Sequence, residues 1–317
     1  MVSIRIRGQM LISIVVPVYN NCGTLRKTFE QIDEQFRTHL PGDLFEVVFV
    51  NDGSKDESLT ELMELRTQYP QAKVLAFTRN FGQNAAMAAG NRHAKGDCVI
   101  VINADLQDPV DLMPHMIKKW KEGFKIVLCA REERQESAYR KIPAAIYYFL
   151  LRLSVPIYPK KGTDYYLIDR AVVDIINPYS NRNSFMTFDI LETGYDFYTF
   201  SYVRREREVG VSGYNFFKRL KHMYDNLINA SYLPIRMMSV CGVVTASSGF
   251  IYAAMVAYSR IFNGTLNFPG YAPIVILILI SSGMIMIMLG IIGEYLWRAF
   301  DYIKARPDYV IRERHLS

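Results

Sequence analysis

Short apolar runs alternate with amphipathic segments along the first 130 residues of the chain. The apolar runs are rich in β-branched residues and have the length of buried strands. They are Ile12–Val16, Phe45–Val50, Val74–Phe77, Val99–Ile102 and Ile126–Cys129. Segments typical of helices separate them at Thr24–Arg37, Ser58–Gln68, Gln83–His93 and Val110–Lys121. This alternation predicts an α/β fold, with a parallel sheet covered by helices on both faces.

The pattern is mixed in the middle of the chain. "AAIYYFLLRL" (144–153) predicts an apolar helix, and "FYTFSYVRRERE" (197–208) predicts a strand that ends in charged residues. "NFFKRLKHMYDNLI" (215–228) is both amphipathic and basic, which is typical of a helix at a membrane surface.

Two long uncharged stretches follow, at 237–259 and 271–293, and each has 23 residues. A helix of about 20 apolar residues is long enough to cross a bilayer. The two stretches therefore predict a transmembrane hairpin, and the alternative is a buried hairpin of a soluble protein.

Basic residues cluster on both flanks of these two stretches. They are Lys218, Arg219, Lys221 and Arg236 before the first stretch, and Arg298, Lys304 and Arg306 after the second. Arg260 is the only charged residue in the connection between the stretches. Because basic loops stay in the cytoplasm, we expect the α/β domain and both termini to be cytoplasmic and the protein to be a multi-pass protein of the inner membrane.

Composition agrees with this picture. Half of the 317 residues are hydrophobic, and the net charge of +6 suits an anionic partner such as a phosphate, a membrane surface or a nucleic acid. The four cysteines are scattered without metal-ligand spacing, which is typical of reduced cytosolic thiols. The N-terminal apolar run is interrupted by Pro17, so it does not predict a secretion signal.

Polar clusters follow three of the predicted strands, as "PVYNN", "NDGSKD" and "NADLQD". In open α/β sheets, ligands bind at the carboxyl ends of the strands. Asp105 and Gln107 supply hard oxygen ligands, which suit Mg²⁺ or Mn²⁺ together with substrate phosphates. Asp108 precedes Pro109, so it has an alternative role as a helix N-cap.

Two further turns have both a structural and a ligand-binding interpretation. Asp52 lies in an Asp-Gly sequence, which is common in ordinary turns. The turn with Arg79, Asn80 and Gly82 can hold a nucleotide, although most such turns only connect a strand to a helix. The sequence contains neither G-x-G-x-x-G nor G-x-x-x-x-G-K-[ST], so it lacks the usual fingerprints of a dinucleotide dehydrogenase and of a P-loop enzyme.

Four segments together resemble the family 2 glycosyltransferases of the GT-A fold, in order and in spacing. They are "ISIVVPVYNN", "VFVNDGSKDES", "TRNFGQNAAMAAG" and "INADLQDP". Later segments narrow the resemblance to polyprenyl-phosphate glycosyltransferases, which include dolichyl-phosphate mannosyltransferases and bactoprenol glucosyltransferases. These segments are "GTDYYLIDRAVVD", "RREREVGVSGYNFFKRL" and "LGIIGEYLWRAFDYIKARPDYVI". The resemblance covers nearly the whole chain, and its "GEY" and "RP-Y" signature is closest to the bactoprenol type.

The resemblance implies a role for each matching residue. The nucleotide sugar would be bound by Pro17, Tyr19, Asp52, Arg79, Asn103, Ala104 and Asp105. Mg²⁺ or Mn²⁺ would be bound by Asp105 and Gln107. The acceptor phosphate would be bound by Arg204, Arg207, Ser212 and Tyr214. The catalytic set would be Asp105, Arg131, Asp164 and Arg207, with Asp164 a candidate for orienting the acceptor. An alternative for Arg204 and Arg207 is a solvated strand end that Glu206 and Glu208 balance.

The chain departs from the family pattern at three positions. Asn103 replaces the common first aspartate of the acidic motif, so metal affinity would rest on Asp105. Asn21 stands where a glutamate is usual, and Tyr166 stands where an Asp-Phe-Arg element would put arginine.

The resemblance divides the chain into a cytoplasmic GT-A domain (1–213), a basic juxtamembrane helix (214–235), a transmembrane hairpin (236–297) and a cytoplasmic basic tail (298–317). It implies an inverting transfer of one sugar from a nucleotide sugar, with a UDP-sugar favoured over a GDP-sugar, to undecaprenyl or another polyprenyl phosphate at the cytoplasmic face. The expected partners are this donor, the lipid acceptor, the bilayer and a second copy of the chain, with no nucleic acid.

Two other functions are compatible with parts of this pattern. One is a processive polysaccharide synthase, which should carry a Gln-x-x-Arg-Trp motif; neither Trp120 nor Trp297 follows an arginine. The other is a non-catalytic membrane module that binds nucleotide or lipid, against which Asp105 and Gln107 count.

Overall fold

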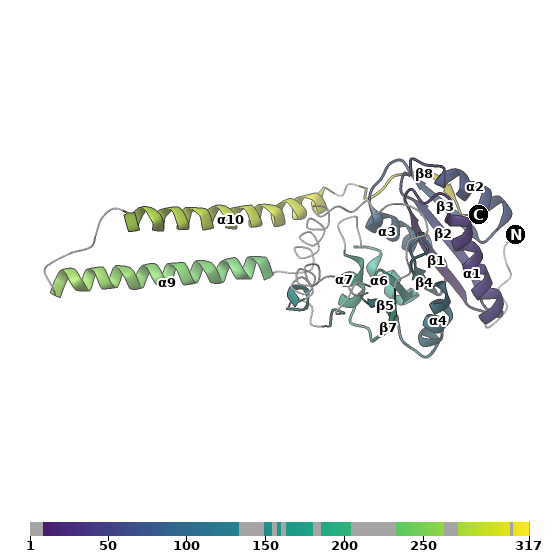
Figure 1. Cartoon of the computed structure of the whole chain (residues 1–317), viewed down its shortest axis with the longest axis horizontal. Helices are drawn as coiled ribbons and strands as arrows, with labels where there is room; N and C mark the ends of the chain where they lie inside the picture. The colour runs from purple at the N-terminus through teal and green to yellow at the C-terminus, as the bar shows by residue number, and fades with distance from the viewer. Residues whose placement is uncertain are drawn as a thin grey trace. The chain divides into compact units, whose positions relative to one another are not determined.

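The computed structural model describes residues 9–132, 149–153, 157–159, 163–179, 185–203, 233–262, 272–304 and 307–316. These residues form two compact units, an α/β unit and a pair of long helices (Figure 1). The α/β unit includes the C-terminal segment from Pro307 onward, which follows the two long helices in the sequence.

The described strands form one eight-stranded sheet with the spatial order β7-β5-β6-β4-β1-β2-β3-β8. Their bounds are Leu11–Val18 (β1), Leu44–Asn51 (β2), Ala72–Phe77 (β3), Cys98–Val101 (β4), Ile126–Glu132 (β5), Tyr165–Asp169 (β6), Phe197–Val203 (β7) and Ile311–His315 (β8). β6 is antiparallel to β4 and β5, and β8 is antiparallel to β3. The other pairs are parallel, so the mostly parallel α/β sheet predicted from the sequence is confirmed.

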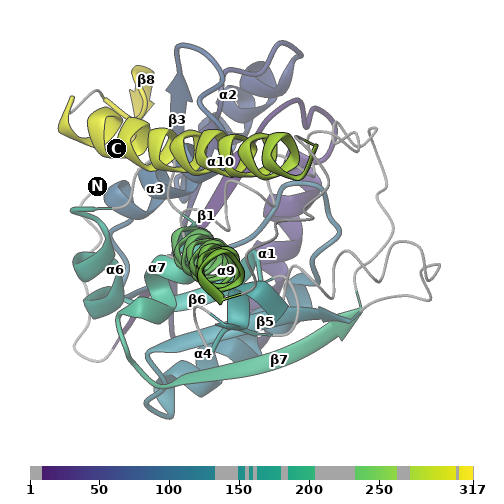
Figure 2. The same ribbon diagram turned by 90° about the vertical axis from the view of Figure 1, so that its left-hand side faces the viewer.

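Helices cover the sheet of the α/β unit. They are α1 (Leu25–His39), α2 (Ser58–Gln68), α3 (Gln83–His93), the 3₁₀ helix η1 (Val110–Leu112), α4 (Met113–Lys121), α6 (Arg170–Ile176) and α7 (Met186–Glu192). Apolar residues of α1, α2 and α4 form one core with alternate residues of β1, β2 and β4. Figure 2 shows the same elements from a second side.

Small residues bring α3 close to the sheet. A Cβ atom on Gly90 would collide with Val15 Cγ1 of β1, and Ala85, Ala86 and Ala89 are also fully buried. Val15 alternates with the β1 residues that face α1, so α3 packs on the opposite face of the sheet. This close packing holds the start of α3 beside the loop that follows β4.

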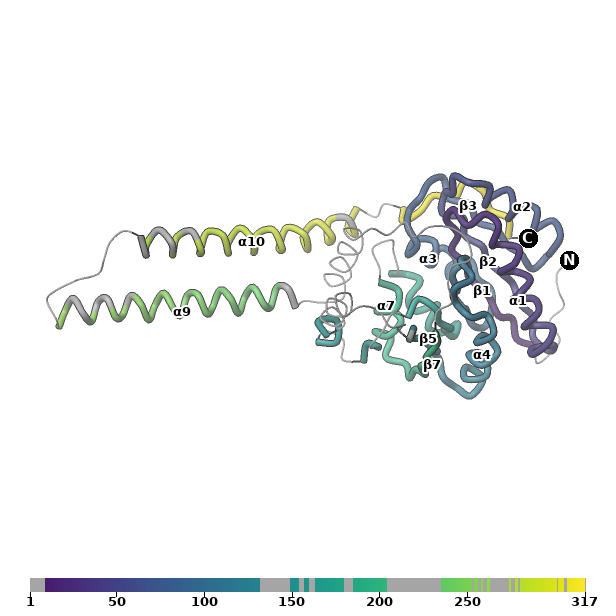
Figure 3. The backbone as a smooth tube through the Cα atoms, in the orientation of Figure 1, coloured from purple at the N-terminus to yellow at the C-terminus, as the bar shows by residue number. Residues whose placement is uncertain are grey.

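β8 was not predicted from the sequence. The segment 298–317, predicted to be a basic tail, contains the end of the long helix α10 (Ala272–Ile303) and then a strand, which pairs with β3 from Val74 to Phe77. Figure 3 lets the reader follow this strand along the edge of β3. Half-buried Ile311, Glu313 and His315 alternate in this strand with exposed arginines. Because an edge strand keeps one face in water, such a charged sequence is difficult to distinguish from a solvated tail.

The second unit consists of α9 (Leu233–Phe262) and α10 (Ala272–Ile303), which contact each other. Each contains a span that is long and apolar enough to cross a membrane, Ile235–Tyr252 in α9 and Ile280–Phe300 in α10. No residue of either span is buried, whereas the core helix of a soluble protein would be mostly buried. Thr245 Oγ1 lies 3.5 Å from Met284 Sδ, which links the two helices.

Several sequence-based predictions fall wholly or partly outside the described residues. The predicted helix at 144–153 is described only at 149–153, which are helical. The predicted strand at 197–208 is described up to Val203, as β7. The predicted basic helix at 215–228 and the acceptor-binding residues Arg204, Arg207, Ser212 and Tyr214 lie outside the described part of the chain.

Candidate active site

The loops at the carboxyl ends of the first strands are joined by hydrogen bonds. The Asn20 backbone N–H donates to Ser54 Oγ (3.0 Å), which ties the loop after β1 to the loop after β2. Thr24 Oγ1 donates to the carbonyl of Ala104 (2.8 Å), which ties the loop after β1 to the loop after β4. Three of the polar clusters picked out from the sequence therefore meet at one edge of the sheet.

Asp52 holds the turn that precedes α3. Its Oδ1 accepts the Phe81 N–H (2.6 Å) and its Oδ2 accepts the Gly82 N–H (2.9 Å). Gly53 has a φ of +63°, and a Cβ atom there would collide with the Arg79 backbone, so only glycine lets these two loops approach this closely. Burial raises the pKa of the Asp52 carboxyl to about 6, against the opposing effect of both hydrogen bonds and of Arg79.

The residues predicted to bind the nucleotide sugar lie along this edge. Pro17 is half-buried near the end of β1, and Tyr19, just after β1, is 44% exposed. Arg79 is exposed, and its guanidinium carbon lies 4.1 Å from the centroid of the Phe81 ring. Ala104 is buried and contributes its carbonyl to Thr24.

The acidic loop after β4 has an unusual backbone. Leu106 has a φ of +58°, in the left-handed region that a leucine seldom adopts. Asp105 and Gln107 flank it, and Asp105 Oδ1 accepts the Gln107 N–H (3.2 Å). Such strain in a buried loop is commonly found at functional sites.

The oxygen donors of this loop fit a hard divalent cation. Mg²⁺ is usually held by one or two carboxylates together with substrate phosphates and waters. Asp105 offers a carboxylate and Gln107 an amide carbonyl. Among the described residues, no group of three or more His, Cys, Asp or Glu side chains could hold a metal ion.

The structure assigns Asp108 a different role from helix capping. Pro109 is the N-cap residue of η1, whereas the Asp108 carboxylate accepts hydrogen bonds from Asn103 Nδ2 (2.7 Å) and Tyr202 Oη (2.6 Å). The Asn103 carbonyl in turn accepts from Gln83 Nε2 at the start of α3 (2.9 Å). Asn103 thus links α3 to Asp108.

This network continues through Tyr202 to Arg131 and Asp164. Arg131 Nε donates to Tyr202 Oη (3.4 Å), and Arg131 Nη2 forms an ion pair with Asp164 Oδ2 (2.6 Å). Burial lowers the pKa of Arg131, but the adjacent Asp164 and Asp108 raise it by more, so the guanidinium stays charged. Burial and Asp108 raise the pKa of Tyr202, which keeps its hydroxyl proton available for Asp108.

Tyr202 was not among the predicted site residues. A signal was present, because Tyr198, Phe200 and Tyr202 share one face of β7, and a buried tyrosine hydroxyl needs a partner. The partner could not be named, since the contact of β7 with the loop after β4 depends on the parallel pairing of β7 with β5.

Two of the departures from the family pattern have a structural explanation. Tyr166 is fully buried in β6, so its side chain cannot take the place of an exposed phosphate-binding arginine. Asn21 Oδ1 accepts the Tyr19 N–H (3.0 Å), and the Asn21 N–H donates to Ser58 Oγ (3.0 Å). Asn21 therefore shapes the loop after β1.

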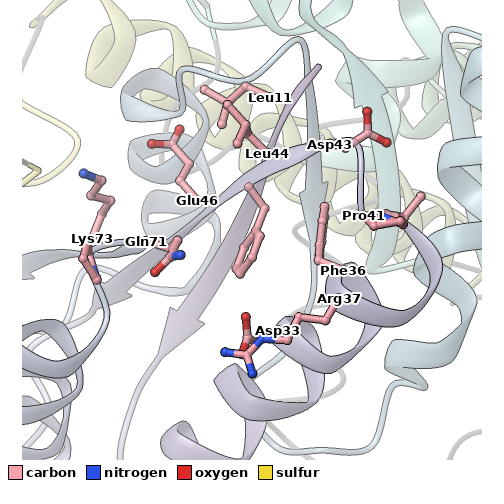
Figure 4. Close-up of a pocket in the computed structure, with 13 residues that line it drawn as sticks. Leu11, Asp33, Phe36, Arg37, Pro41, Asp43, Leu44, Glu46, Gln71 and Lys73 are labelled. Atoms are coloured by element: carbon pink, nitrogen blue, oxygen red, sulfur yellow. The ribbon is translucent and has the colours of Figure 1, made fainter. Parts of the chain in front are cut away.

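A cavity of about 730 Å³ lies elsewhere, at the amino ends of β2 and β3 beside the end of α1 (Figure 4). Its lining includes Phe36, Leu40, Phe45 and Lys73. This cavity is separate from the candidate active site, because it lies at the amino ends of the strands and the site lies at their carboxyl ends.

The sequence pattern described as Glycosyl transferase family 2 matches residues 13–194. The chain is 35% identical over 305 residues to the uncharacterized glycosyltransferase YkcC of Bacillus subtilis, covering 96% of this chain and 94% of that protein. It is 35% identical over 309 residues to the SfII prophage-derived bactoprenol glucosyl transferase of Shigella flexneri, covering 96% and 99%. The chain therefore belongs to glycosyl transferase family 2, and it is a glycosyltransferase that uses a nucleotide sugar.

Similarity to solved structures is lower. The glucosyl-3-phosphoglycerate synthase of Mycobacterium tuberculosis, in complex with phosphoglyceric acid, is 18% identical with a TM-score of 0.49, covering 69% of this chain and 78% of that chain. The mannosyltransferase PcManGT of Pyrobaculum calidifontis, in complex with GDP-Man and Mn²⁺, is 17% identical with a TM-score of 0.44, covering 92% and 88%.

Proposed function

We propose that this glycosyltransferase moves one sugar from a nucleotide donor, UDP-linked rather than GDP-linked, to a polyprenyl phosphate at the cytoplasmic face of a membrane. One observation carries the proposal. The similarity to proteins named bactoprenol glucosyl transferases extends over 96% of the chain, and thus includes both apolar helices as well as the α/β unit. A lipid acceptor gives these helices a function, because it confines the reaction to the membrane surface.

The donor would lie across the carboxyl ends of β1 to β4. Tyr19 is exposed there for contact with the base, and Asp52 fixes the turn that presents Arg79. The start of α3 lies beside the same turn, and the N-terminus of a helix favours the negative charge of a diphosphate. Asn103, held between Gln83 and Asp108, would border the sugar.

The acceptor is itself the nucleophile. A phosphate monoester has a second pKa near 6, so at pH 7 it is largely ionised and needs no strong general base. Its oxygen would attack the anomeric carbon on the face opposite the diphosphate, which inverts that centre. The ion pair with Arg131 commits Asp164 to holding the guanidinium rather than removing a proton.

Charge on the leaving diphosphate must be neutralised as the glycosidic bond breaks. Arg131 is permanently charged and is held between Tyr202 and Asp164, so it needs little reorganisation to stabilise that charge. Mg²⁺ or Mn²⁺, when bound by Asp105 and Gln107, would supply further neutralisation. Arg204, Arg207, Ser212 and Tyr214 are the proposed contacts of the acceptor phosphate.

Chain topology supports a two-span arrangement. The segments before α9 and after α10 both belong to the α/β unit, so the chain must cross any membrane an even number of times between them. The positive flanks support a cytoplasmic α/β unit. Nucleotide sugars would then reach the site directly from the cytoplasm.

The decisive experiment offers the purified full-length protein a panel of radiolabelled nucleotide sugars, with and without undecaprenyl phosphate. We expect label in the lipid extract with one donor only, and only when the polyprenyl phosphate is present. An Asp105→Ala variant is the matched control for label carried over without catalysis. Label in a polymer, or no lipid-phase label with any donor, would contradict the proposed function.

A further inference from the structure

The segment after α10 packs against the end of β3. The Tyr309 ring stacks on the Phe77 ring, with centroids 5.0 Å apart and planes 11° from parallel. The Thr78 N–H donates to the carbonyl of Val310 (3.0 Å). The "RP-Y" signature thus brings Tyr309 to the point where β3 ends and the Arg79 turn begins.

Aromatic contacts extend from Tyr309 to Arg79. The buried Phe77 ring meets the Phe81 ring edge to face, with centroids 5.7 Å apart. Phe81 in turn lies under the Arg79 guanidinium, 4.1 Å from its central carbon. Tyr309, Phe77 and Phe81 therefore form an aromatic column that ends at the arginine predicted to bind the donor.

The column adds side-chain contacts to a turn whose backbone is hydrogen-bonded to Asp52. Asp52 fixes only the backbone of the turn, through the N–H groups of Phe81 and Gly82. The Phe81 side chain depends on Phe77, and Phe77 depends on Tyr309. Asp308 anchors the segment next to Tyr309, because its carboxylate lies 3.5 Å from Arg92 of α3.

We propose that Tyr309 is a positioning residue for the nucleotide donor, acting through Phe77 and Phe81 on Arg79. This inference rests on the proposed function, in which Arg79 contacts the nucleotide sugar. It assigns the donor site a component from the last ten residues of the chain, which lie beyond both apolar helices in the sequence. The Tyr309 hydroxyl plays no part, since the contact is between ring faces.

The test compares Tyr309→Ala, Tyr309→Phe and wild type as full-length protein in detergent. Tyr195→Ala is the matched control, because Tyr195 is 37% exposed before β7, at the amino end of that strand. Loss of one stacked aromatic pair should raise the donor KM roughly threefold to tenfold. We expect kcat to change by less than about twofold, because the enzyme saturated with donor reacts through the same transition state.

A second measurement is independent of nucleotide. Trypsin cleaves after Arg79 only when the turn opens, so the cleavage rate without ligand reports how firmly the turn is held. We expect faster cleavage at Arg79 in Tyr309→Ala, by a similar factor to the change in KM. Tyr309→Phe and Tyr195→Ala should match wild type in both measurements.

Each other outcome overturns some part of the inference. Wild-type KM and cleavage in Tyr309→Ala would remove Tyr309 from the donor site altogether. A threefold to tenfold fall in kcat with an unchanged donor KM would also overturn the inference, since that result indicates loss of folded, active enzyme. A third outcome separates the two proposals. If Tyr309→Ala is cleaved faster but the wild-type protein binds no nucleotide sugar, the proposed function is refuted and the contact between Tyr309 and the turn is retained.

Discussion

Both carboxylate oxygens of Asp52 accept hydrogen bonds from backbone N–H groups, and the residue is only 3% exposed. Desolvation disfavours its charged form, which raises its pKa to about 6. Above this pH the carboxylate accepts both hydrogen bonds. Below it, one oxygen carries a proton and can no longer accept in the same way, so the Arg79 turn loosens.

We therefore expect the donor Kd to rise as the pH falls through about 6. Equilibrium binding of an intact nucleotide sugar between pH 5 and 8, without the acceptor, will measure this, because the substituted diphosphate does not titrate there whereas the acceptor phosphate does. Asp52→Asn is the control: it should have a high Kd throughout and lack the inflection. Identical pH profiles for wild type and Asp52→Asn would contradict the assignment.

Asp105 and Asn103 should differ in the consequence of their removal. Asp105 is the carboxylate that we assign to the cation, so Asp105→Ala should abolish turnover. Asn103 instead bonds Gln83 and Asp108, so Asn103→Ala should lose positioning and keep a measurable fraction of activity. Transfer assays on variants with wild-type unfolding midpoints will compare them, and complete loss in both would refute the unequal roles.

Removal of the cation is a separate test of the same loop. We expect chelation to abolish turnover, and Mg²⁺ or Mn²⁺ to restore it, because Asp105 and Gln107 would hold the ion together with substrate phosphates and waters rather than in an all-protein cage. Full turnover in excess chelator would exclude the metal assignment.

At the scale of elements, the strands and helices of the first 130 residues were predictable because each has a strong local pattern. Ser58–Gln68 and Gln83–His93 were predicted with the bounds that α2 and α3 have in the structure. Local patterns do not encode partners. The antiparallel pairing of β6 between β4 and β5, and the addition of β8 to β3, depend on contacts between distant parts of the sequence.

The same limit applies to the candidate site. The proximity of the loops that carry Asp52, Arg79 and Asp105 could be predicted because the carboxyl ends of parallel strands meet at one edge. The hydrogen bond that Tyr202 donates to Asp108 could not be predicted, because 94 residues separate the two. The local sequence favoured helix capping as the role of Asp108, and it contained no indication of the long-range contact with Tyr202.

Packing of α3 against β1 provides a test at this scale. Gly90→Ala would drive a methyl group into Val15, so α3 must shift, at a cost of roughly 1–3 kcal/mol. Gly42→Ala is the matched control, because a Cβ atom there would have nothing within 4 Å. Thermal unfolding should show a lower midpoint for Gly90→Ala only, and equal midpoints would contradict the close packing.

For the whole molecule, the proposed topology predicts which thiols a membrane-impermeant reagent reaches in intact cells. In a background lacking the exposed Cys22 and Cys241, a cysteine introduced at Asn263 should be labelled from outside. Cysteines at Lys55, which is exposed near Gly53, or at Lys304 should be labelled only after the cells are opened. The opposite pattern would invert the hairpin and separate the donor site from cytoplasmic nucleotide sugars.

The position of β8 has a consequence for biosynthesis. A ribosome makes β3 early but makes its edge partner only after both apolar helices have been translated. Until then, β3 presents an unpaired edge, which is a hazard for aggregation. The strand β8 therefore joins the sheet last, when the apolar helices of the nascent chain are already available for insertion into a membrane. A chain that terminates before Pro307 would lack both this edge strand and Tyr309.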